Sequence, residues 1–237
     1  PKFDTYLLAV AVSYLGAVPV MVSYHFPVNT MDVFAERLED PFILFDDQTA
    51  AVVAQMQNSS TEKQISIAQL LQQTAKEVPQ IFLPLDQISY MTHTSGTTGI
   101  PKLICHSANS MGWRTLWQRK IFQKIAAKKL VAFHISPVHS RFNIGIASLM
   151  AMGFPMMPLN TFDSRKIAQM IAEYQPIAFE THPNNFVQWS FLAQEQPAAF
   201  ASIRYYHSTF DAINNRTMAA FLAAANDPEA IFLQVYG

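Results

Sequence analysis

Charged residues are scarce in this sequence. Lys, Arg, Asp and Glu together make up 14% of the 237 residues, and hydrophobic residues make up 50%. A typical soluble domain carries about 25% charged residues. We therefore expect some apolar faces to be covered by another domain, a partner or further chain, and a large compact core is the alternative explanation. The net charge of -1 lacks the basic excess of a nucleic-acid-binding protein, so nucleic acid is not an expected partner.

Cysteine occurs once, as Cys105. One cysteine excludes a disulfide within the chain and is typical of a reducing compartment, so we expect a cytoplasmic protein. We expect Cys105 to be a small buried apolar residue, and a nucleophile is the alternative. The chain begins with Pro1 and has no initiator Met, which predicts that its natural start lies further upstream.

Residues 5–31 contain no Asp, Glu, Lys or Arg. This length could span a membrane or belong to a signal peptide. Gly16, however, stands where a helix would stop, and Pro19 interrupts any helix that continues. The valines that follow favour a strand. We therefore predict a buried helix over residues 3–15, then a buried strand, and no membrane span.

From residue 86 onward, short β-branched or aromatic runs alternate with segments of helical period. This alternation predicts an α/β fold with mostly parallel sheets covered by helices. The expected strands are 87–93, 103–106, 130–134, 155–159, 177–180, 203–206 and 231–235, and the expected helices are 108–124, 143–152, 164–174, 184–193 and 215–225.

The helix expected at 164–174 has the clearest pattern. Asp163 precedes its first turn as an N-cap and Pro176 follows its last turn. Its apolar residues recur with helical spacing and are predicted to be core. They are Ile167, Met170, Ile171 and Tyr174. Elsewhere Trp113, Trp117 and Trp189 indicate packing first and a substrate pocket second.

The first 60 residues look different from the rest. Short strands are expected at 17–23, 42–45 and 51–54, and the polar stretch 58–63 is expected to be an exposed loop. We predict one partial domain over residues 1–237. Within it, residues 1–60 supply the early helix and the short strands of one sheet, and residues 86–237 form the regular β/α part.

Seven glycines occur in the chain, and two of them lie in the run HTSGTTGIPK, at 93–102, between two expected strands. Glycine lets backbone N–H groups approach a ligand, hydroxyls donate to phosphate oxygens, and a lysine adds a point charge. The run therefore predicts a polyphosphate site. It differs from the P-loop, where Lys directly follows the second Gly. A connector rich in turn residues is the alternative, but it does not account for nine consecutive positions of this kind.

The segment TSGTTGIPK closely resembles the signature of the adenylate-forming, or AMP-binding, superfamily. This superfamily includes acyl- and aryl-CoA synthetases, peptide-synthetase adenylation domains and luciferases. Weaker resemblance covers YLGAVPVMVSYHFP, SPVHSRFNIGIASLMAMGFPMMPLNTFD, STFDAI and the final VYG. The resemblance implies that the chain is an incomplete large N-terminal domain of an adenylate-forming enzyme, which acts with ATP and Mg²⁺.

The resemblance also implies a role for each matching position. The loop would hold the β- and γ-phosphates of ATP, with Lys102 as its catalytic residue. Asp211, Tyr236 and Gly237 match positions that line the adenine. His139 matches a histidine that borders the acyl pocket, and a hydrogen-bonded histidine at a strand end is the alternative. The phosphate-binding positions are Thr94, Ser95, Gly96, Thr97, Thr98, Gly99 and Lys102.

The sequence also departs from the family pattern. Thr209 and Phe210 replace two glycines of the adenine-side loop. No Asp occurs in residues 135–145, where amino-acid-activating relatives place one. An aryl or acyl acid is therefore favoured over an α-amino acid, and PKLI, at 101–104, is a variant of aryl-acid-activating members. His134 and His139 could suggest a metal pair, but without a third ligand we predict no metal site on protein side chains.

The resemblance implies that acid and ATP give an acyl-adenylate and pyrophosphate, and that a thiol of CoA or of a carrier protein then accepts the acyl group. The chain stops at Gly237, before the family's Thr-Glu, its ribose-binding Asp and the small C-terminal domain with a catalytic Lys. We therefore expect these residues to be inactive alone. The alternative is a non-catalytic module that binds nucleotide or acyl groups.

Overall fold

The computed structural model describes residues 3–96, 99–125 and 127–235. They form two compact units, one made of Pro1–Leu8 and Asn109–Gly237 and the other of Ala9–Ala108. We call them the sheet unit and the loop unit. Among the described residues, no helix is both long enough and apolar enough to cross a membrane.

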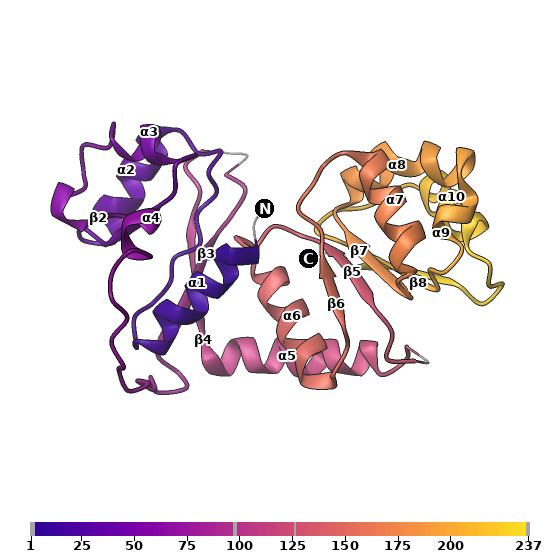
Figure 1. Ribbon diagram of the computed structural model, residues 1–237, viewed down its shortest axis with the longest axis horizontal. Helices are drawn as coiled ribbons and strands as arrows, with labels where there is room; N and C mark the ends of the chain where they lie inside the picture. Colours follow the sequence, from indigo (N-terminus) through magenta and orange to yellow (C-terminus); the bar gives the residue numbers. More distant parts are fainter. Residues whose placement is uncertain (1–2, 97–98, 126, 236–237) are drawn as a thin grey trace. The chain divides into compact units, whose positions relative to one another are not determined.

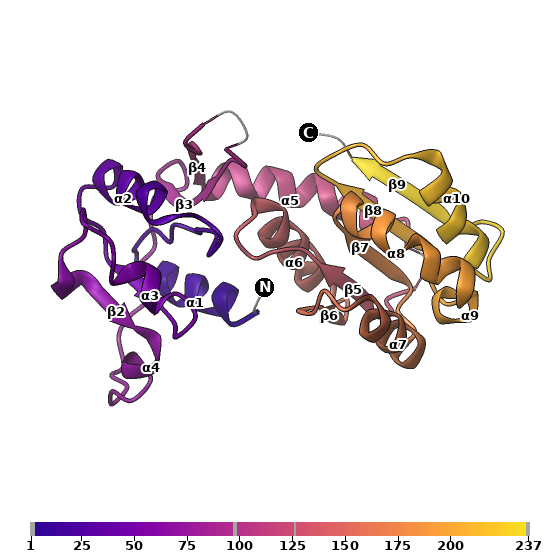
Figure 2. The same cartoon turned by 90° about the horizontal axis from the view of Figure 1, so that it is seen from above.

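The sheet unit contains five parallel strands in the order β6-β5-β7-β8-β9 (Figures 1 and 2). The predicted parallel sheet is confirmed for the strands after residue 130. Neighbouring strands pair in a regular register, with Glu180 of β7 opposite His207 of β8. The strands are β5 (Val131–His134), β6 (Met156–Pro158), β7 (Ala178–Thr181), β8 (Tyr205–Thr209) and β9 (Ile231–Val235).

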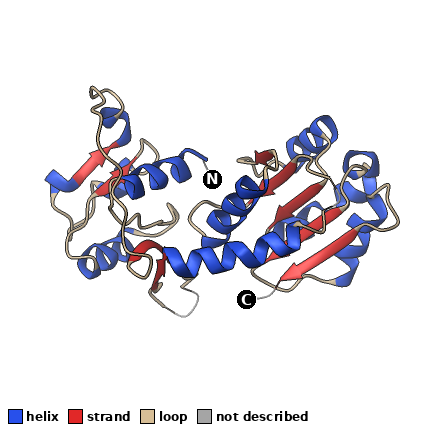
Figure 3. Ribbon diagram, turned by 90° about the horizontal axis from the view of Figure 1, so that it is seen from below, coloured by secondary structure: helices blue, strands red, loops and turns tan. Residues whose placement is uncertain are grey.

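Helices cover both faces of this sheet, as a mostly apolar parallel sheet requires (Figure 3). One face packs against α5 (Ala108–Phe122) and α6 (Ser140–Met152). The opposite face packs against helices that come from the second half of the unit. They are α7 (Ser164–Tyr174), α8 (Pro183–Glu195), α9 (Pro197–Phe200) and α10 (Asn215–Ala224).

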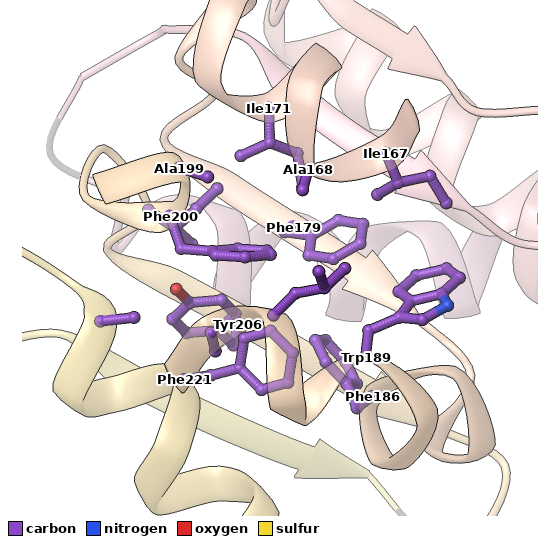
Figure 4. Close-up of a cluster of buried hydrophobic side chains, with 14 of the residues drawn as sticks. Ile167, Ala168, Ile171, Phe179, Phe186, Trp189, Ala199, Phe200, Tyr206 and Phe221 are labelled. Carbon is purple, nitrogen blue, oxygen red and sulfur yellow. The ribbon is translucent and has the colours of Figure 1, made fainter. Parts of the chain in front are cut away.

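The main core lies between the sheet and these later helices, and Figure 4 shows its aromatic side chains. The rings of Phe186 and Phe221 meet edge to face with centroids 5.0 Å apart. Phe179 stacks on Trp189 at 6.1 Å. Burying each such side chain contributes roughly 1.5–3 kcal/mol, so this cluster is a major source of the unit's stability.

The predicted cap of α7 is confirmed. The Asp163 carboxylate accepts hydrogen bonds from the backbone N–H groups of Arg165 and Lys166, at 3.0 and 3.3 Å. Ile167 and Ile171 are buried as predicted. Tyr174 is not part of the core, because 53% of it is exposed in the last turn of the helix.

The three tryptophans do not all pack. Trp189 is buried in the main core, but Trp113 and Trp117 of α5 are 61% and 64% exposed. The packing interpretation is therefore wrong for those two residues. The ammonium of Lys120 lies 4.2 Å from the centre of the Trp117 ring, a cation–π contact that a partly exposed indole can make.

The loop unit is built from short elements. The helix α1 (Phe3–Tyr14) begins in the sheet unit and runs into the loop unit. It ends two residues before Gly16, whose φ of 73° confirms the predicted stop. The remaining elements are α2 (Val28–Arg37), β1 (Ile43–Phe45), α3 (Ala50–Val53), η1 (Thr61–Lys63), β2 (Gln64–Ser66), α4 (Ile67–Leu70), β3 (Ile88–His93) and β4 (Leu103–Ser107).

Several predictions for the loop unit are wrong. The strand expected at 51–54 is the helix α3, whose start is fixed by a turn in which Asp46 accepts a hydrogen bond from the Thr49 N–H group. The helix predicted to be buried at residues 3–15 has Ala9 as its only buried residue among 3–14. Residues 17–23 form only an isolated bridge, from Val20 to Met91. Cys105 on β4 is exposed, because a two-stranded sheet leaves one face uncovered.

The strands β3 and β4 pair with each other in an antiparallel sheet and do not join the five parallel strands. A parallel connection requires a crossover of a dozen or more residues. The linking residues 94–102 are too few for that crossover, and no helix is assigned among those of them that the structure describes. The phosphate-loop motif therefore closes a hairpin.

We predict that Phe221→Ala lowers the unfolding free energy by about 3–5 kcal/mol, because it empties the centre of the main core. Urea unfolding followed by tryptophan fluorescence measures this change, since Trp113, Trp117 and Trp189 all lie in the sheet unit. The control is Met150→Ala, at a residue 60% exposed, with an expected change within about 0.5 kcal/mol. Equal losses of unfolding free energy for the two substitutions would contradict the placement of Phe221 at the centre of the main core.

Candidate functional site

The motif at 94–102 is closed at its base by two hydrogen bonds. The Thr94 N–H group donates to the Lys102 carbonyl at 3.0 Å, and the Lys102 N–H group donates to Thr94 Oγ1, also at 3.0 Å. The ends of the motif therefore continue the β3–β4 ladder. Ser95 and Lys102 are exposed, so the Ser95 hydroxyl and the Lys102 ammonium are accessible, whereas the Gly99 N–H group donates to the Gly96 carbonyl at 3.1 Å. Thr97 and Thr98 lie outside the described residues.

The glycines of the loop meet a real backbone requirement. Gly96 has a φ of 69° and Gly99 a φ of 144°, which side-chain-bearing residues rarely adopt. A Cβ atom at Gly96 would lie 2.5 Å from Cγ of Pro101. The turn therefore depends on the absence of a side chain at Gly96, because the Pro101 ring packs where that side chain would lie.

The base of the loop rests on a histidine with a defined tautomer. His93 Nδ1 lies 2.9 Å from the Thr94 carbonyl, so it donates its proton there. Its Nε2 atom then accepts the backbone N–H group of Ser23 at 3.2 Å. Burial lowers the pKa of His93, which favours this neutral form. Arg37 Nη1 also donates to the Pro101 carbonyl at 3.3 Å.

The other predicted site residues belong to the sheet unit. His139 is the N-cap residue of α6, at the carboxyl-end edge of the sheet, where open α/β folds bind ligands. Asp211 is exposed, and its carboxylate accepts the N–H group of Ala212 at 2.7 Å. Tyr236 and Gly237 lie outside the described residues. The phosphate-loop residues and these adenine-side residues thus come from different units.

Phe210, which stands where the resemblance expects a glycine, keeps a glycine-like backbone with a φ of 87°. Such a conformation costs a non-glycine residue about 1–3 kcal/mol. The Phe210 ring stacks on His182 at 5.2 Å and contacts His139 at 5.0 Å. Burial lowers the pKa of His182, and the charge of Asp211 partly opposes that shift. The phenylalanine at position 210 therefore adds an aromatic cluster, and the backbone keeps the positive φ that a glycine would adopt there.

A buried polar cluster beneath this edge was missed by the sequence analysis. The guanidinium of Arg141 donates to both oxygens of Glu180, from Nε at 2.5 Å and from Nη2 at 2.6 Å. It also donates from Nη1 to Gln118 Oε1 at 2.5 Å. His207 Nδ1 lies 3.0 Å from Glu180 Oε2. We call these four residues the Arg141 cluster.

The electrostatics of the Arg141 cluster centre on Glu180. Burial alone would raise the pKa of Glu180, but the charge of Arg141, supported by His207, holds it at about 2. A carboxylate this deep remains ionised only when paired and hydrogen-bonded. Glu180 therefore serves as a fixed anion that orients the groups around it.

Some buried polar atoms at this edge lack a partner within the part of the chain that the structure describes. They include Nε2 of His207, Nε2 of Gln118 and Oγ1 of Thr209. Each such atom costs roughly 1–3 kcal/mol if nothing satisfies it. His207 and Thr209 are two residues apart on β8, so both side chains point to the face covered by α5 and α6. Buried polar atoms without protein partners, gathered near one edge of the sheet, are typical of a region where a ligand supplies the missing hydrogen bonds.

His134 provides a contrast. Its Nε2 atom donates to the Thr161 carbonyl at 2.9 Å, and its Nδ1 atom accepts from Asn185 Nδ2 at 3.0 Å. Burial lowers the pKa of His134 to about 4, so it is a satisfied, neutral, structural histidine. Across the described part of the chain, no three His, Cys, Asp or Glu residues lie together as a metal site would require.

The sequence did contain a signal for the Arg141 cluster. Arg141 is the only Lys, Arg, Asp or Glu between Lys129 and Asp163. Glu180 is likewise the only one between Glu173 and Glu195. Isolated charges of opposite sign in buried segments are rarely left unpaired, so this pair could have been proposed.

Comparison with known proteins supports the interpretation of the motif. Residues 3–237 match the family described as AMP-binding enzyme. The chain is also similar to 3-amino-2-hydroxy-4-methoxybenzoate diazotase from Streptomyces cremeus, with 31% identity over 269 aligned positions. That match covers all of this chain and 48% of the diazotase. The chain therefore spans about half the length of this curated relative.

Solved structures with the same fold cover the whole chain. One is ATP-bound MatB from Rhodopseudomonas palustris, with a TM-score of 0.79, 17% identity and 48% of its chain covered. Another is o-succinylbenzoate coenzyme A synthetase from Bacillus subtilis in complex with ATP and a magnesium ion, with a TM-score of 0.79, 15% identity and 48% of its chain covered. A third is a luciferase-like enzyme from the mealworm Zophobas morio, with a TM-score of 0.78, 17% identity and 58% of its chain covered.

We predict that Phe210→Gly is more stable than Phe210→Ala by about 1 kcal/mol. Both variants lose the ring contacts, but only glycine relieves the positive φ. Urea unfolding followed by tryptophan fluorescence measures the difference. The matched pair is Phe162→Gly and Phe162→Ala, at an exposed residue without a positive φ, where the order should reverse. The same order at both positions would contradict the strain argument.

We predict that Glu180→Gln lowers the unfolding free energy at pH 7 by about 3–5 kcal/mol, because Arg141 loses its buried counter-ion. The stabilisation from Glu180 is fully present above its usual pKa of 4.5 and is lost as pH falls toward about 2. Urea unfolding across this pH range should therefore show a shallower pH dependence in the variant. Glu195→Gln, at an exposed residue, is the control. An unchanged pH slope in Glu180→Gln would contradict this account.

Proposed function

Because the chain belongs to the AMP-binding enzyme family, we propose that it is the part of an acid-activating enzyme that holds the polyphosphate of ATP. In this proposal an acid and ATP give an acyl-adenylate and pyrophosphate, and a thiol of CoA or of a carrier protein then accepts the acyl group. The observation that carries the proposal is the hairpin loop at 94–102, whose turn is built on two glycines with positive φ and whose Ser95 hydroxyl and Lys102 ammonium belong to exposed residues.

The loop suits the chemistry of this reaction. A carboxylate oxygen attacks the α-phosphorus, an O–P bond forms, and the bond to pyrophosphate breaks. The protein has little covalent work to do, so positioning and charge neutralisation carry the catalysis. In this proposal Thr94, Ser95 and Lys102 hold the β- and γ-phosphates, together with Thr97, Thr98 and the two glycines. Asp211, Tyr236 and Gly237 line the adenine, and His139 borders the acid.

A magnesium ion fits this proposal with a particular division of ligands. Mg²⁺ is usually held by phosphate oxygens, waters and one or two carboxylates. The loop at 94–102 carries no Asp or Glu. The ion would therefore rest on phosphates held by the loop and on carboxylates from elsewhere in the whole protein. Its chemical contribution would be to neutralise the charge that develops on the departing pyrophosphate.

An aromatic acid is the substrate class that we propose. The diazotase relative acts, by its name, on an aromatic acid that bears amino and hydroxyl groups. The absence of Asp from residues 135–145 argues against an α-amino acid. Phe210, His139 and His182 place aromatic rings together at the carboxyl-end edge of the sheet, where a flat ring could stack.

A second candidate function is ATP-dependent diazotisation of an aromatic amine, favoured by the 31% identity with a diazotase along the whole chain. In this version nitrite is the acid. A nitrite oxygen attacks the α-phosphorus and pyrophosphate leaves. The amine nitrogen then attacks the nitrite nitrogen, AMP leaves, and loss of water gives the diazonium group. The same phosphate loop would serve both reactions.

Pyrophosphate release by the full-length protein distinguishes these candidates. We expect ATP-dependent release with an aryl carboxylic acid from a panel that also includes fatty acids and α-amino acids. Release that requires nitrite and an aromatic amine together would favour diazotisation. No release with any member would favour a non-catalytic binding module. Residues 1–237 alone should show no exchange of pyrophosphate with ATP. Measurable ATP–pyrophosphate exchange by these residues alone would contradict that expectation.

We predict that Lys102→Ala in the full-length protein lowers the rate of pyrophosphate release by about 10²–10³-fold, because a positive charge at the leaving group is removed. The effect should fall mainly on kcat, since the charge interacts more strongly with the departing pyrophosphate than with bound ATP. Steady-state kinetics measure it.

Lys76→Ala is the matched control, because Lys76 is an exposed lysine of the same unit. It should leave kcat and KM unchanged. Equal rates for Lys102→Ala and Lys76→Ala would remove Lys102 from the proposed site.

A further inference from the structure

Two buried side-chain nitrogens of the Arg141 cluster, Nε2 of Gln118 and Nε2 of His207, have no hydrogen-bond partner within the described part of the chain. Arg141 donates to Glu180 and to Gln118, and Glu180 accepts from both Arg141 and His207. The side chain of His207 is 9% exposed, yet its Nε2 atom has no hydrogen-bond partner within the described part of the chain. The cluster therefore presents a single buried, unpaired ring nitrogen.

The neighbours of His207 decide which kind of ligand Nε2 can take. Nδ1 lies 3.0 Å from Glu180 Oε2 and 3.3 Å from Arg141 Nη2. A carboxylate only accepts hydrogen bonds, so the closer contact places the proton of a neutral ring on Nδ1. In that neutral ring Nε2 carries a lone pair, which accepts a hydrogen bond and cannot donate one.

His134 shows that a buried histidine of this sheet can have both ring nitrogens satisfied by the fold. His134 lies on β5 and is equally buried, and both of its ring nitrogens are satisfied by neighbours at 2.9 and 3.0 Å. In His207, only Nδ1 has hydrogen-bonding partners among the described residues, and Nε2 has none. The Nε2 side of His207 is therefore the side on which a ligand can form a hydrogen bond.

The position of Nε2 in the fold also suits a ligand. Glu180 and His207 pair directly across β7 and β8, close to the carboxyl ends of these parallel strands, which is the edge where open α/β sheets bind ligands. Thr209, two residues further along the same face of β8, has a second buried oxygen without a partner among the described residues. Phe210 follows directly, with its ring stacked on His182.

We propose that Nε2 of His207 accepts a hydrogen bond from an amino or hydroxyl substituent on the aromatic ring of the substrate. His207 is thus a specificity-determining residue, and Glu180 and Arg141 are positioning residues that fix the ring so that its Nε2 lone pair is not used by the protein. This inference rests on the proposed function, because it names the class of acid: an aryl acid whose ring carries a hydrogen-bond donor.

The test measures the binding of substituted benzoates to the full-length protein by isothermal titration calorimetry. At each ring position the amino-, hydroxy- and methylbenzoates are compared, because the methyl group is similar in size and lacks a donor. We expect the best amino or hydroxy acid to bind at least about tenfold more tightly than its methyl counterpart, the factor expected of one hydrogen bond to a buried acceptor.

His207→Asn keeps an amide donor near the position of Nδ1 and removes the acceptor at Nε2. It should reduce the preference to about twofold or less by weakening only the donor-bearing acids. His207→Gln places an amide near the position of Nε2 and should restore part of the preference. His25→Asn, at an exposed histidine of the loop unit, should change nothing. Tryptophan fluorescence checks that each variant is folded.

The outcomes separate this inference from the proposed function. Pyrophosphate release without any donor preference, or a preference that survives in His207→Asn, would overturn the role of His207 and leave the function in place. A donor preference lost in His207→Asn, but without pyrophosphate release from any acid, would support the recognition site and refute the enzyme. Binding of none of the acids would overturn the inference.

Discussion

The parallel sheet of the sheet unit must be covered on both faces, and this constraint governs most of what is seen there. All residues of β5 and β7 are buried, so any polar side chain on them loses its water. Helices α5 and α6 cover one face and α7 to α10 the other. Polar chemistry can survive only near the strand ends or as compensated clusters.

The Arg141 cluster is such a compensated group. Glu180 stands on a strand whose other side chains are buried, and Arg141 reaches it from the first turn of α6. The pair is neutral as a whole, which makes burial tolerable, and its geometry fixes the ring of His207. Because the buried charges must be paired, their hydrogen bonds also hold the ring of His207 near the carboxyl-end edge of the sheet. The aromatic contacts of Phe210 lie at that edge as well.

Prediction from the sequence worked best where local pattern and tertiary constraint agree. The strands after residue 130 were recognised because a parallel sheet requires continuous apolar runs, and α7 because its cap and its apolar spacing coincide. The loop unit was predicted less well. Its elements are three to six residues long apart from α1 and α2, too short for periodicity to separate helix from strand, as the helix at 50–53 demonstrates.

The sequence by itself determined the phosphate-loop motif and the family, because nine consecutive positions must combine glycine freedom with hydroxyl and ammonium donors at fixed spacing. It also carried the two isolated charges at Arg141 and Glu180. Only the tertiary structure decided that these charges meet, since 39 residues separate them along the chain and no local pattern encodes that distance. It likewise decided that Phe210 adopts a positive φ, and that His134 is satisfied while Nε2 of His207 is not. Such differences arise from neighbours brought together by folding.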